Sequence, residues 1–220
     1  MLKPFAEAIG VVSILIFYAI MGQSAQISER KWDFDASSVD QPPTGFSFGR
    51  TGSGRMGRWL IKAEKDAPSG AHVLAQVDND PTSYRFPIAI AEELSLRDFR
   101  LAVRCKPVSG KVDQACGLVF RYIDENNYYV TRANALEDNV RFYHVIAGKR
   151  SEVASWSGPV SSASWHELSV NAKGDLFEIS WDSKKVIEAR DKTFSEPGKI
   201  GLWTKADSVT YFDDLTVEAK

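Results

Sequence analysis

Short runs of alternating apolar and polar residues recur from about residue 30 onward, and they constrain the fold more than any other feature. They are bounded by Gly, Pro, Asn and Asp, which favour turns, and no convincing long segment carries apolar residues at helical spacing. The pattern predicts an all-β protein with one helical turn, at 91–96. The expected strands are 32–35, 45–48, 59–63, 72–77, 84–90, 98–106, 116–123, 128–135, 140–146, 152–155, 165–172, 176–181, 186–190, 199–205 and 209–217.

So many strands in one short chain predict two antiparallel sheets packed face to face, because a single wide, twisted sheet curls or splits. A jelly-roll β-sandwich is the expected architecture, since no repeat of propeller-blade length is visible. The composition, 44% hydrophobic and 25% charged over 220 residues, is that of an ordinary globular protein and predicts one domain over 26–220. The Pro/Gly-rich stretch 41–58 lies too near the start to be an interdomain linker, so we expect a long surface loop there.

The first 25 residues differ from the rest of the chain. Lys3 precedes an apolar run from Ala8 to Met21, and small residues follow up to Ala25. The run is shorter than the roughly 20 residues of a membrane-spanning helix, which favours a signal peptide cleaved near Ala25. An uncleaved N-terminal anchor is the alternative. Either way, we expect a secreted or periplasmic protein.

The two cysteines, Cys105 and Cys116, lie on neighbouring predicted strands with alternating apolar flanks. If the strands form a hairpin, Cys105 faces Cys116 and Phe99 faces Tyr122, so that apolar residues meet on one face. An oxidising compartment would allow a disulfide across this hairpin. Two buried free thiols are the other possibility.

Polar and aromatic side chains gather on the opposite face of these strands. With Leu118, Phe120 and Tyr122 directed to the core, Arg121 points outward. If the following hairpin places Tyr122 opposite Tyr129, Arg132 lies on the same outer face as Arg121. A register shifted by one residue would bury Arg132. The expected sugar-facing patch comprises Arg121, Tyr128, Arg132, Asn134, Asn139, Arg141 and Tyr143. Glu137 or Asp138 could neutralise the neighbouring Arg121 and Arg132, although outer faces of antiparallel sheets are often polar without binding anything.

Charge and catalytic motifs exclude several classes of function. The net charge of -2 gives no general attraction to nucleic acid or to anionic membranes. No pair of carboxylates alternates along a predicted strand as in many jelly-roll glycosidases, and the three histidines lack metal-ligand spacing. Asp213 and Asp214 could bind calcium together with Asp33 or Asp35, but strand-end aspartates that cap turns are the favoured explanation. No other cofactor is expected.

The stretches GLVFRYIDENNYYVTRANALEDNVRFYHV, WHELSV and GKIGLWTKADSVTYFDDLTV resemble the 3-keto-disaccharide hydrolase domain group and its laminin-G-like relatives. The resemblance spans about residues 32–217 and implies a concanavalin A-like jelly roll in an exported bacterial protein. It also implies cleavage of glycosides whose sugar has been oxidised at C3. The residues in the matching stretches are Arg121, Asn127, Tyr128, Arg132, Asn134, Glu137, Asn139, Trp203, Lys205 and Asp207.

These observations predict a carbohydrate-active protein that recognises sugar on one sheet face. In an enzyme, Arg121 or Arg132 would polarise the ketone of a 3-keto-glucoside, and Glu137 is the candidate catalytic base. Trp203 and Lys205 would join the ligand-binding residues. A non-catalytic carbohydrate-binding module and an adhesion domain without a small ligand are the alternatives, because this fold hosts all three.

Overall fold

The predicted strand pattern is confirmed by a computed structural model, which describes Met1 and residues 29–220. The signal peptide or anchor predicted within residues 1–25, with its cleavage point, lies outside the described residues. No helix in the described part of the chain could span a membrane. The strands are β1 (Arg30–Trp32), β2 (Phe46–Gly52), β3 (Trp59–Ala63), β4 (His72–Gln76), β5 (Arg85–Leu96), β6 (Phe99–Ser109), β7 (Ala115–Asp124), β8 (Asn127–Asn134), β9 (Asn139–Ile146), β10 (Lys149–Ser157), β11 (His166–Lys173), β12 (Leu176–Trp181), β13 (Lys184–Arg190), β14 (Gly198–Trp203) and β15 (Val209–Ala219).

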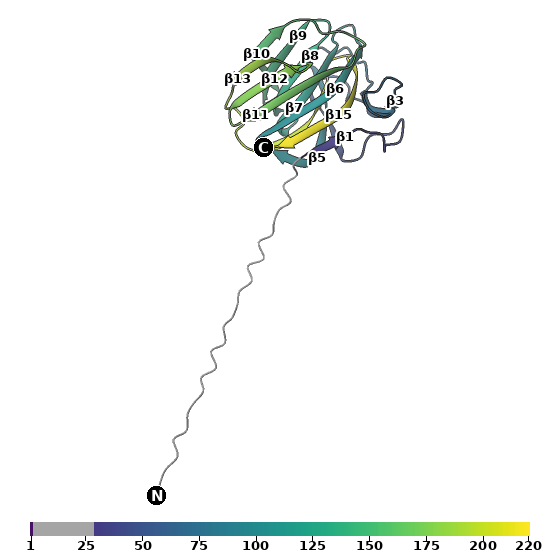
Figure 1. The fold of residues 1–220 in the computed structure, drawn as a ribbon. Coiled ribbons are helices and arrows are strands. Elements are labelled where there is room, and N and C mark those ends of the chain that lie inside the picture. The colour runs from purple at the N-terminus through teal and green to yellow at the C-terminus, as the bar shows by residue number, and fades with distance from the viewer. Residues whose placement is uncertain (2–28) are drawn as a thin grey trace.

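The strands form two antiparallel sheets packed face to face as a jelly roll (Figure 1). The eight-stranded sheet has the order β13-β12-β11-β6-β15-β4-β3, with β1 paired to β15, and the seven-stranded sheet has the order β10-β9-β8-β7-β14-β5-β2. The first and last strands thus lie side by side, with Trp32 opposite Leu215. One local expectation was wrong and another was incomplete. Residues 91–96 continue β5 instead of forming a helical turn, because β14 and β2 both pair with it. Within 41–58, the strand expected at 45–48 is present as the longer edge strand β2, so less of this stretch is loop than expected.

An aromatic cluster fills the space between the sheets. Phe120 is fully buried, and its ring centroid lies 5.6 Å from that of Tyr129, 5.9 Å from Phe142 and 5.7 Å from Phe177. Phe120, Tyr129 and Phe142 come from the seven-stranded sheet and Phe177 from the eight-stranded sheet. The alternation seen in the sequence therefore does identify the inward-facing residues of both sheets.

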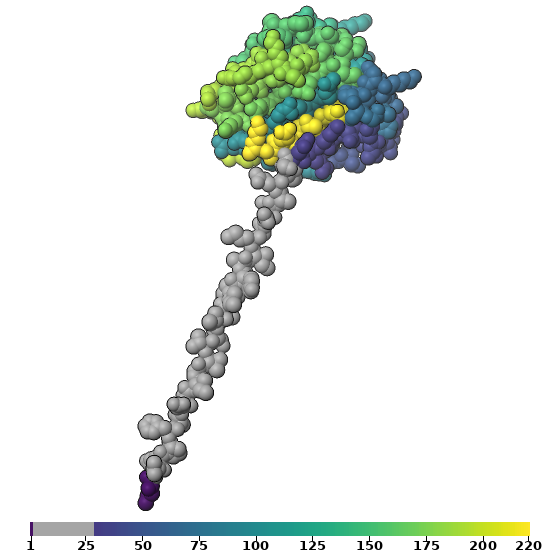
Figure 2. Space-filling view, in the orientation of Figure 1, coloured from purple at the N-terminus to yellow at the C-terminus, as the bar shows by residue number. Residues whose placement is uncertain are grey.

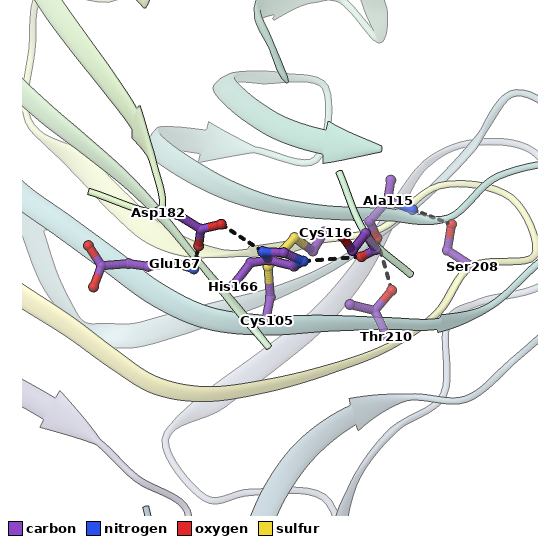
Figure 3. The surroundings of a disulfide bond; sticks show 9 residues. Cys105, Ala115, Cys116, His166, Glu167, Asp182, Ser208 and Thr210 are labelled. Atoms are coloured by element: carbon purple, nitrogen blue, oxygen red, sulfur yellow. Dashed lines mark hydrogen bonds and ion pairs between the residues drawn. A yellow bond between two sulfur atoms is a disulfide. The ribbon is translucent and has the colours of Figure 1, made fainter. Parts of the chain in front are cut away.

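The disulfide between Cys105 and Cys116 is present, but the predicted hairpin is not. Cys105 lies on β6 in the eight-stranded sheet and Cys116 on β7 in the seven-stranded sheet, with their Cα atoms 6.3 Å apart (Figure 3). The bond therefore links the two sheets through the core. Inward-facing residues meet across a sandwich as well as within a hairpin, so alternation alone could not distinguish the two arrangements.

Loss of this disulfide is expected to destabilise the fold. Its two cysteines are separated by 11 positions, and closing so short a loop stabilises by about 3 kcal/mol at most. We expect Cys105→Ala/Cys116→Ala to lower the free energy of unfolding by up to that amount, as measured by urea denaturation. Reductant should destabilise the wild type and leave the double variant unchanged. Equal sensitivity of both proteins to reductant would contradict this expectation.

A β-bulge in β7 corrects the predicted direction of two side chains. The pairing of β7 with β8 shifts between Phe120 and Asp124, and Arg121 takes a positive φ of 45°. Phe120 therefore pairs with Tyr129, two residues away from the predicted register. Beyond the bulge, Tyr122 packs against a second apolar cluster instead of the core, and Arg121 turns inward. We call this second set the outer apolar cluster: Phe86, Ile88, Ile90, Ala115, Val119, Tyr128, Val130, Tyr143, Val145 and Trp203. The faces predicted for β8 and β9 are nevertheless right, because a shift of two residues preserves the alternation.

Candidate functional site

A polar cluster lies where the outer face of the seven-stranded sheet meets the β6–β7 and β8–β9 connections. In the register, Arg132 on β8 is opposite Arg141 on β9, and Asn134 is opposite Asn139. The β8–β9 turn adds Glu137. Asp113, in the β6–β7 connection, and Lys205, in the segment that follows β14, complete the group. We call this set the Arg132 cluster: Asp113, Arg132, Asn134, Glu137, Asn139, Arg141, Tyr143 and Lys205.

Arg132 is the hub of this cluster. Although it belongs to the outer face as predicted, it is only 1% exposed. Its Nη2 donates to Glu137 Oε2 at 2.8 Å and to the Tyr143 hydroxyl at 3.3 Å, and its Nη1 donates to the side-chain oxygen of Asn139. These bonds fix the guanidinium in one orientation before any ligand arrives.

Glu137 pairs with Arg132 and lies near Arg141, whereas the sequence had suggested that an acidic residue here would neutralise Arg121 and Arg132. Its Oε2 also accepts a hydrogen bond from Asn139 at 3.2 Å and lies 3.8 Å from Arg141 Nη2. Burial raises the pKa of Glu137, but the charges of Arg132 and Lys205 and the Asn139 bond outweigh this and lower the pKa below its usual range. Glu137 is therefore ionised at neutral pH. Its carboxylate can accept hydrogen bonds, but it is a weak base for removing a proton from a substrate.

Asp113 is a member that the sequence analysis missed. It is fully buried, pairs with Lys205, and accepts a hydrogen bond from Asn134 at 2.9 Å. Burial raises the pKa of Asp113 despite the opposing effect of Lys205. Asp207 holds the loop that carries it, since its carboxylate accepts backbone N–H bonds from Lys111, Val112 and Asp113 at 2.7 to 3.1 Å. No alternation marks loop residues, so only the three-dimensional structure could identify Asp113.

Arg150 was also missed, and it covers the aromatic residues beside the cluster. Its guanidinium carbon lies 4.3 Å from the ring centroid of Tyr143, 4.7 Å from Phe86 and 5.6 Å from Trp203. Its Nη1 is buried without a hydrogen-bond partner among the described residues. Burial lowers the pKa of Arg150, and its side chain forms no ion pair among the described residues. The guanidinium therefore has a donor that no described residue uses.

Four residues implicated from the sequence lie apart from this arrangement or beneath it. Arg121 belongs to the other end of β7, where it donates to the carbonyls of Arg97, Gly174 and Phe194. Asn127 donates to Asp124 in the turn at that same end. Tyr128 and Trp203 are fully buried in the outer apolar cluster, and the Tyr128 hydroxyl lies 2.7 Å from that of Thr51. We infer structural roles for all four.

The aspartates considered for calcium have protein partners. Asp213 accepts a hydrogen bond from the Ser69 backbone at 3.0 Å, and Asp214 pairs with Lys31 at 2.7 Å. Asp33 accepts a hydrogen bond from the Asp35 backbone at 3.3 Å. Among the described residues, no group of three or more His, Cys, Asp and Glu side chains is arranged to hold a metal ion. The geometry fits the turn-capping alternative.

Asp213 should make stability depend on pH. Burial raises its pKa from 3.8 to about 6, against the backbone bonds from Ser69 and Asp214. The folded protein then binds more protons than the unfolded chain between these values, so this group's contribution to stability falls as pH rises from about 4 to 6. We expect Asp213→Asn to remove that part of the fall, as measured by urea denaturation across this range. Exposed Asp33→Asn is the control, and an unchanged pH profile in Asp213→Asn would contradict the assignment.

Comparisons with known proteins agree with this architecture. No protein-family model matches the chain. A levanase of Bacillus subtilis is 34% identical over 98 residues, which are 44% of this chain and 14% of the levanase. The solved carbohydrate binding module CBM66 from Bacillus subtilis is 25% identical, with a TM-score of 0.62 over 83% of this chain and all of that one.

A plant lectin extends the likeness at the level of fold alone. Lectin II from Ulex europaeus is 7% identical, with a TM-score of 0.60 over 86% of this chain and 97% of the lectin. The matched strands and the two-sheet topology agree with the concanavalin A-like fold expected from the sequence, whereas these matches do not extend to the 3-keto-disaccharide hydrolase group. The chain is a concanavalin A-like jelly roll similar to a carbohydrate binding module and to part of a levanase.

Proposed function

We propose that this protein binds carbohydrate without cleaving it, through the Arg132 cluster. The observation that carries the proposal is the fixed network of Arg132, Glu137 and Asn139 at an accessible edge of the sheet, where the side chains of Glu137 and Arg141 are 36% and 37% exposed. Paired guanidinium and carboxylate groups supply the donors and acceptors that adjacent sugar hydroxyls require. The carbohydrate binding module and the levanase support the same reading.

The sugar would be held mainly by hydrogen bonds. Tyr143 is 4% exposed and Trp203 is fully buried, and Arg150 lies over both rings. These rings therefore cannot stack on a pyranose face. The unpaired Arg150 guanidinium instead offers donors beside Arg132. Because the matched relative is a levanase, levan is the first polysaccharide to test.

The charge state of the cluster favours binding over hydrolysis. A catalytic base works best when its pKa is near the working pH, but the surroundings of Glu137 lower its pKa. The other carboxyl group, Asp113, is fully buried and paired with Lys205, so it is inaccessible to a glycosidic bond. Hydrolysis of 3-keto-glycosides is the competing function, and its support is the sequence resemblance.

Export fits this role. The disulfide requires an oxidising compartment, and polysaccharides such as levan are met outside the cytoplasm. We infer that the domain spanning 26–220 acts in the periplasm or outside the cell.

Calorimetric titration with levan, inulin, arabinan and xylan tests the proposal. We expect saturable binding of levan and no low-molecular-mass product after prolonged incubation, as followed by chromatography. Incubation with 3-keto-disaccharides, with and without divalent metal, is the parallel assay. Turnover there would establish the enzyme, and an absence of binding to all four polysaccharides at millimolar sugar would favour an adhesion domain.

A further inference from the structure

The outer face of the eight-stranded sheet carries a polar groove that is separate from the Arg132 cluster. Hollows of about 460 and 340 Å³ lie on this face, and both are lined by Arg100 and Glu167. The two hollows therefore adjoin each other on this face, and we refer to them together as the groove. Figure 2 shows the molecule from this side, with β15 in yellow and β11 to β13 in green.

The groove runs across the strands. Six strands contribute to its lining: β1, through Lys31, and the five neighbouring strands β15, β6, β11, β12 and β13. With neighbouring strands about 4.8 Å apart, the four intervals between them span roughly 19 Å. This length suits an extended chain of several sugar units better than a single small molecule.

The floor of the groove is made of small side chains. Ala102 on β6 and Ser169 on β11 are 5% and 6% exposed, and Ser180 on β12 continues the row. Small residues at these positions let a ligand approach the sheet closely. None of the described residues that line the two hollows is aromatic, so contact there would depend on hydrogen bonds.

Charged side chains of both signs form the walls. Lys31, Arg100, Arg104 and Lys185 alternate with Glu167, Glu178 and Asp214. Such interleaving produces no net field that would select a polyanion or a polycation. It does supply guanidinium donors and carboxylate acceptors side by side, which is the chemistry that binds neighbouring hydroxyls.

Two arginines in the groove have unused donors. Arg100 reaches Glu167 at 3.6 Å and Glu218 at 3.8 Å, which are ion-pair distances too long for hydrogen bonds. The Nε of Arg104 is buried and has no hydrogen-bond partner in the described part of the chain. A buried donor without a partner costs free energy, which a ligand hydroxyl in the groove would recover.

We propose that this groove is a second carbohydrate site, which binds an internal segment of an extended, neutral oligosaccharide. The proposal rests on the proposed function, since it takes the same class of ligand. The two sites lie on opposite sheets of the sandwich, so one short oligosaccharide cannot occupy both. Two different segments of a polysaccharide could bind the two sites at the same time. The overall avidity would then exceed the affinity of either site alone.

Amide NMR shifts of the full chain, titrated with a levan-derived disaccharide and hexasaccharide, test the groove. We expect the hexasaccharide to shift amides of residues 100–104 and 167–169 as well as those of residues 132–143, and the disaccharide to shift mainly the latter. Arg100→Ala should weaken the groove response about tenfold, as expected for the loss of a charged hydrogen bond. Ser169→Trp fills the groove and should abolish the response, whereas Arg190→Ala, on β13 outside the groove, is the control.

The outcomes separate the two proposals. Shifts confined to residues 132–143 would overturn the groove and leave the proposed function intact. Shifts confined to the groove would support it and overturn the assignment of the Arg132 cluster. If neither region responds to levan or to xylohexaose, both proposals fail. Because the Arg100 side chain is 40% exposed, Arg100→Ala remains informative if Ser169→Trp does not fold.

Discussion

Replacing Arg132 by alanine is expected to weaken the binding of levan oligosaccharides at the seven-stranded sheet at least about tenfold. The change removes three side-chain hydrogen bonds, to Glu137, Asn139 and Tyr143, and leaves Glu137 without its nearest cation. A hydrogen bond to a charged group contributes about 1.5 to 3 kcal/mol, so the affinity should fall at least about tenfold. Calorimetric titration of the wild type and the variant measures the difference.

Two further variants make this result specific. Arg132→Lys keeps the charge but loses the planar fork that reaches Glu137 and Asn139 together, so we expect it not to restore binding. Arg190→Ala removes an arginine that is 65% exposed on β13 and should bind like the wild type. Circular dichroism should show folded protein in each case. Unchanged affinity in a folded Arg132→Ala protein would rule out the cluster as the sugar site.

The largest loss of stability is expected from Phe120→Ala. This ring is fully buried and contacts aromatic side chains from both sheets, including Phe99 and Phe177 of the eight-stranded sheet. Truncating a buried phenylalanine leaves a cavity and typically lowers the free energy of unfolding by about 3 to 5 kcal/mol. We expect a loss of this size for Phe120→Ala. The measurement is the free energy of unfolding from urea denaturation.

Ile123→Ala is the matched control for this change. Ile123 lies on the same strand, β7, but is 63% exposed, so its truncation should change the free energy of unfolding by less than about 0.5 kcal/mol. A loss for Phe120→Ala no larger than that of the control would mean that the aromatic cluster does not hold the sheets together.

The alternation of apolar residues was sufficient to predict the strands and which of their faces are buried. Each of the fifteen expected strands overlaps an observed one, and Phe120, Tyr129 and Phe142 face the core as predicted. The two-residue period is a local property of an extended chain, so it can be read without knowing what each strand pairs with. The same period placed Arg132, Asn139 and Arg141 on one outer face.

Contacts between elements distant in the sequence could not be predicted in this way. The bulge at Arg121 turned that arginine away from the expected patch, and a bulge changes the alternation at a single residue without leaving a clear sequence signal. Arg150 and Asp113 reach the site from an edge strand and a loop, respectively. The sequence by itself determined an all-β chain, its inward-facing residues and two inward-facing cysteines that could pair. Only the tertiary structure decided that the disulfide joins two sheets and which side chains meet at the site, because pairing between sheets depends on packing that no local pattern encodes.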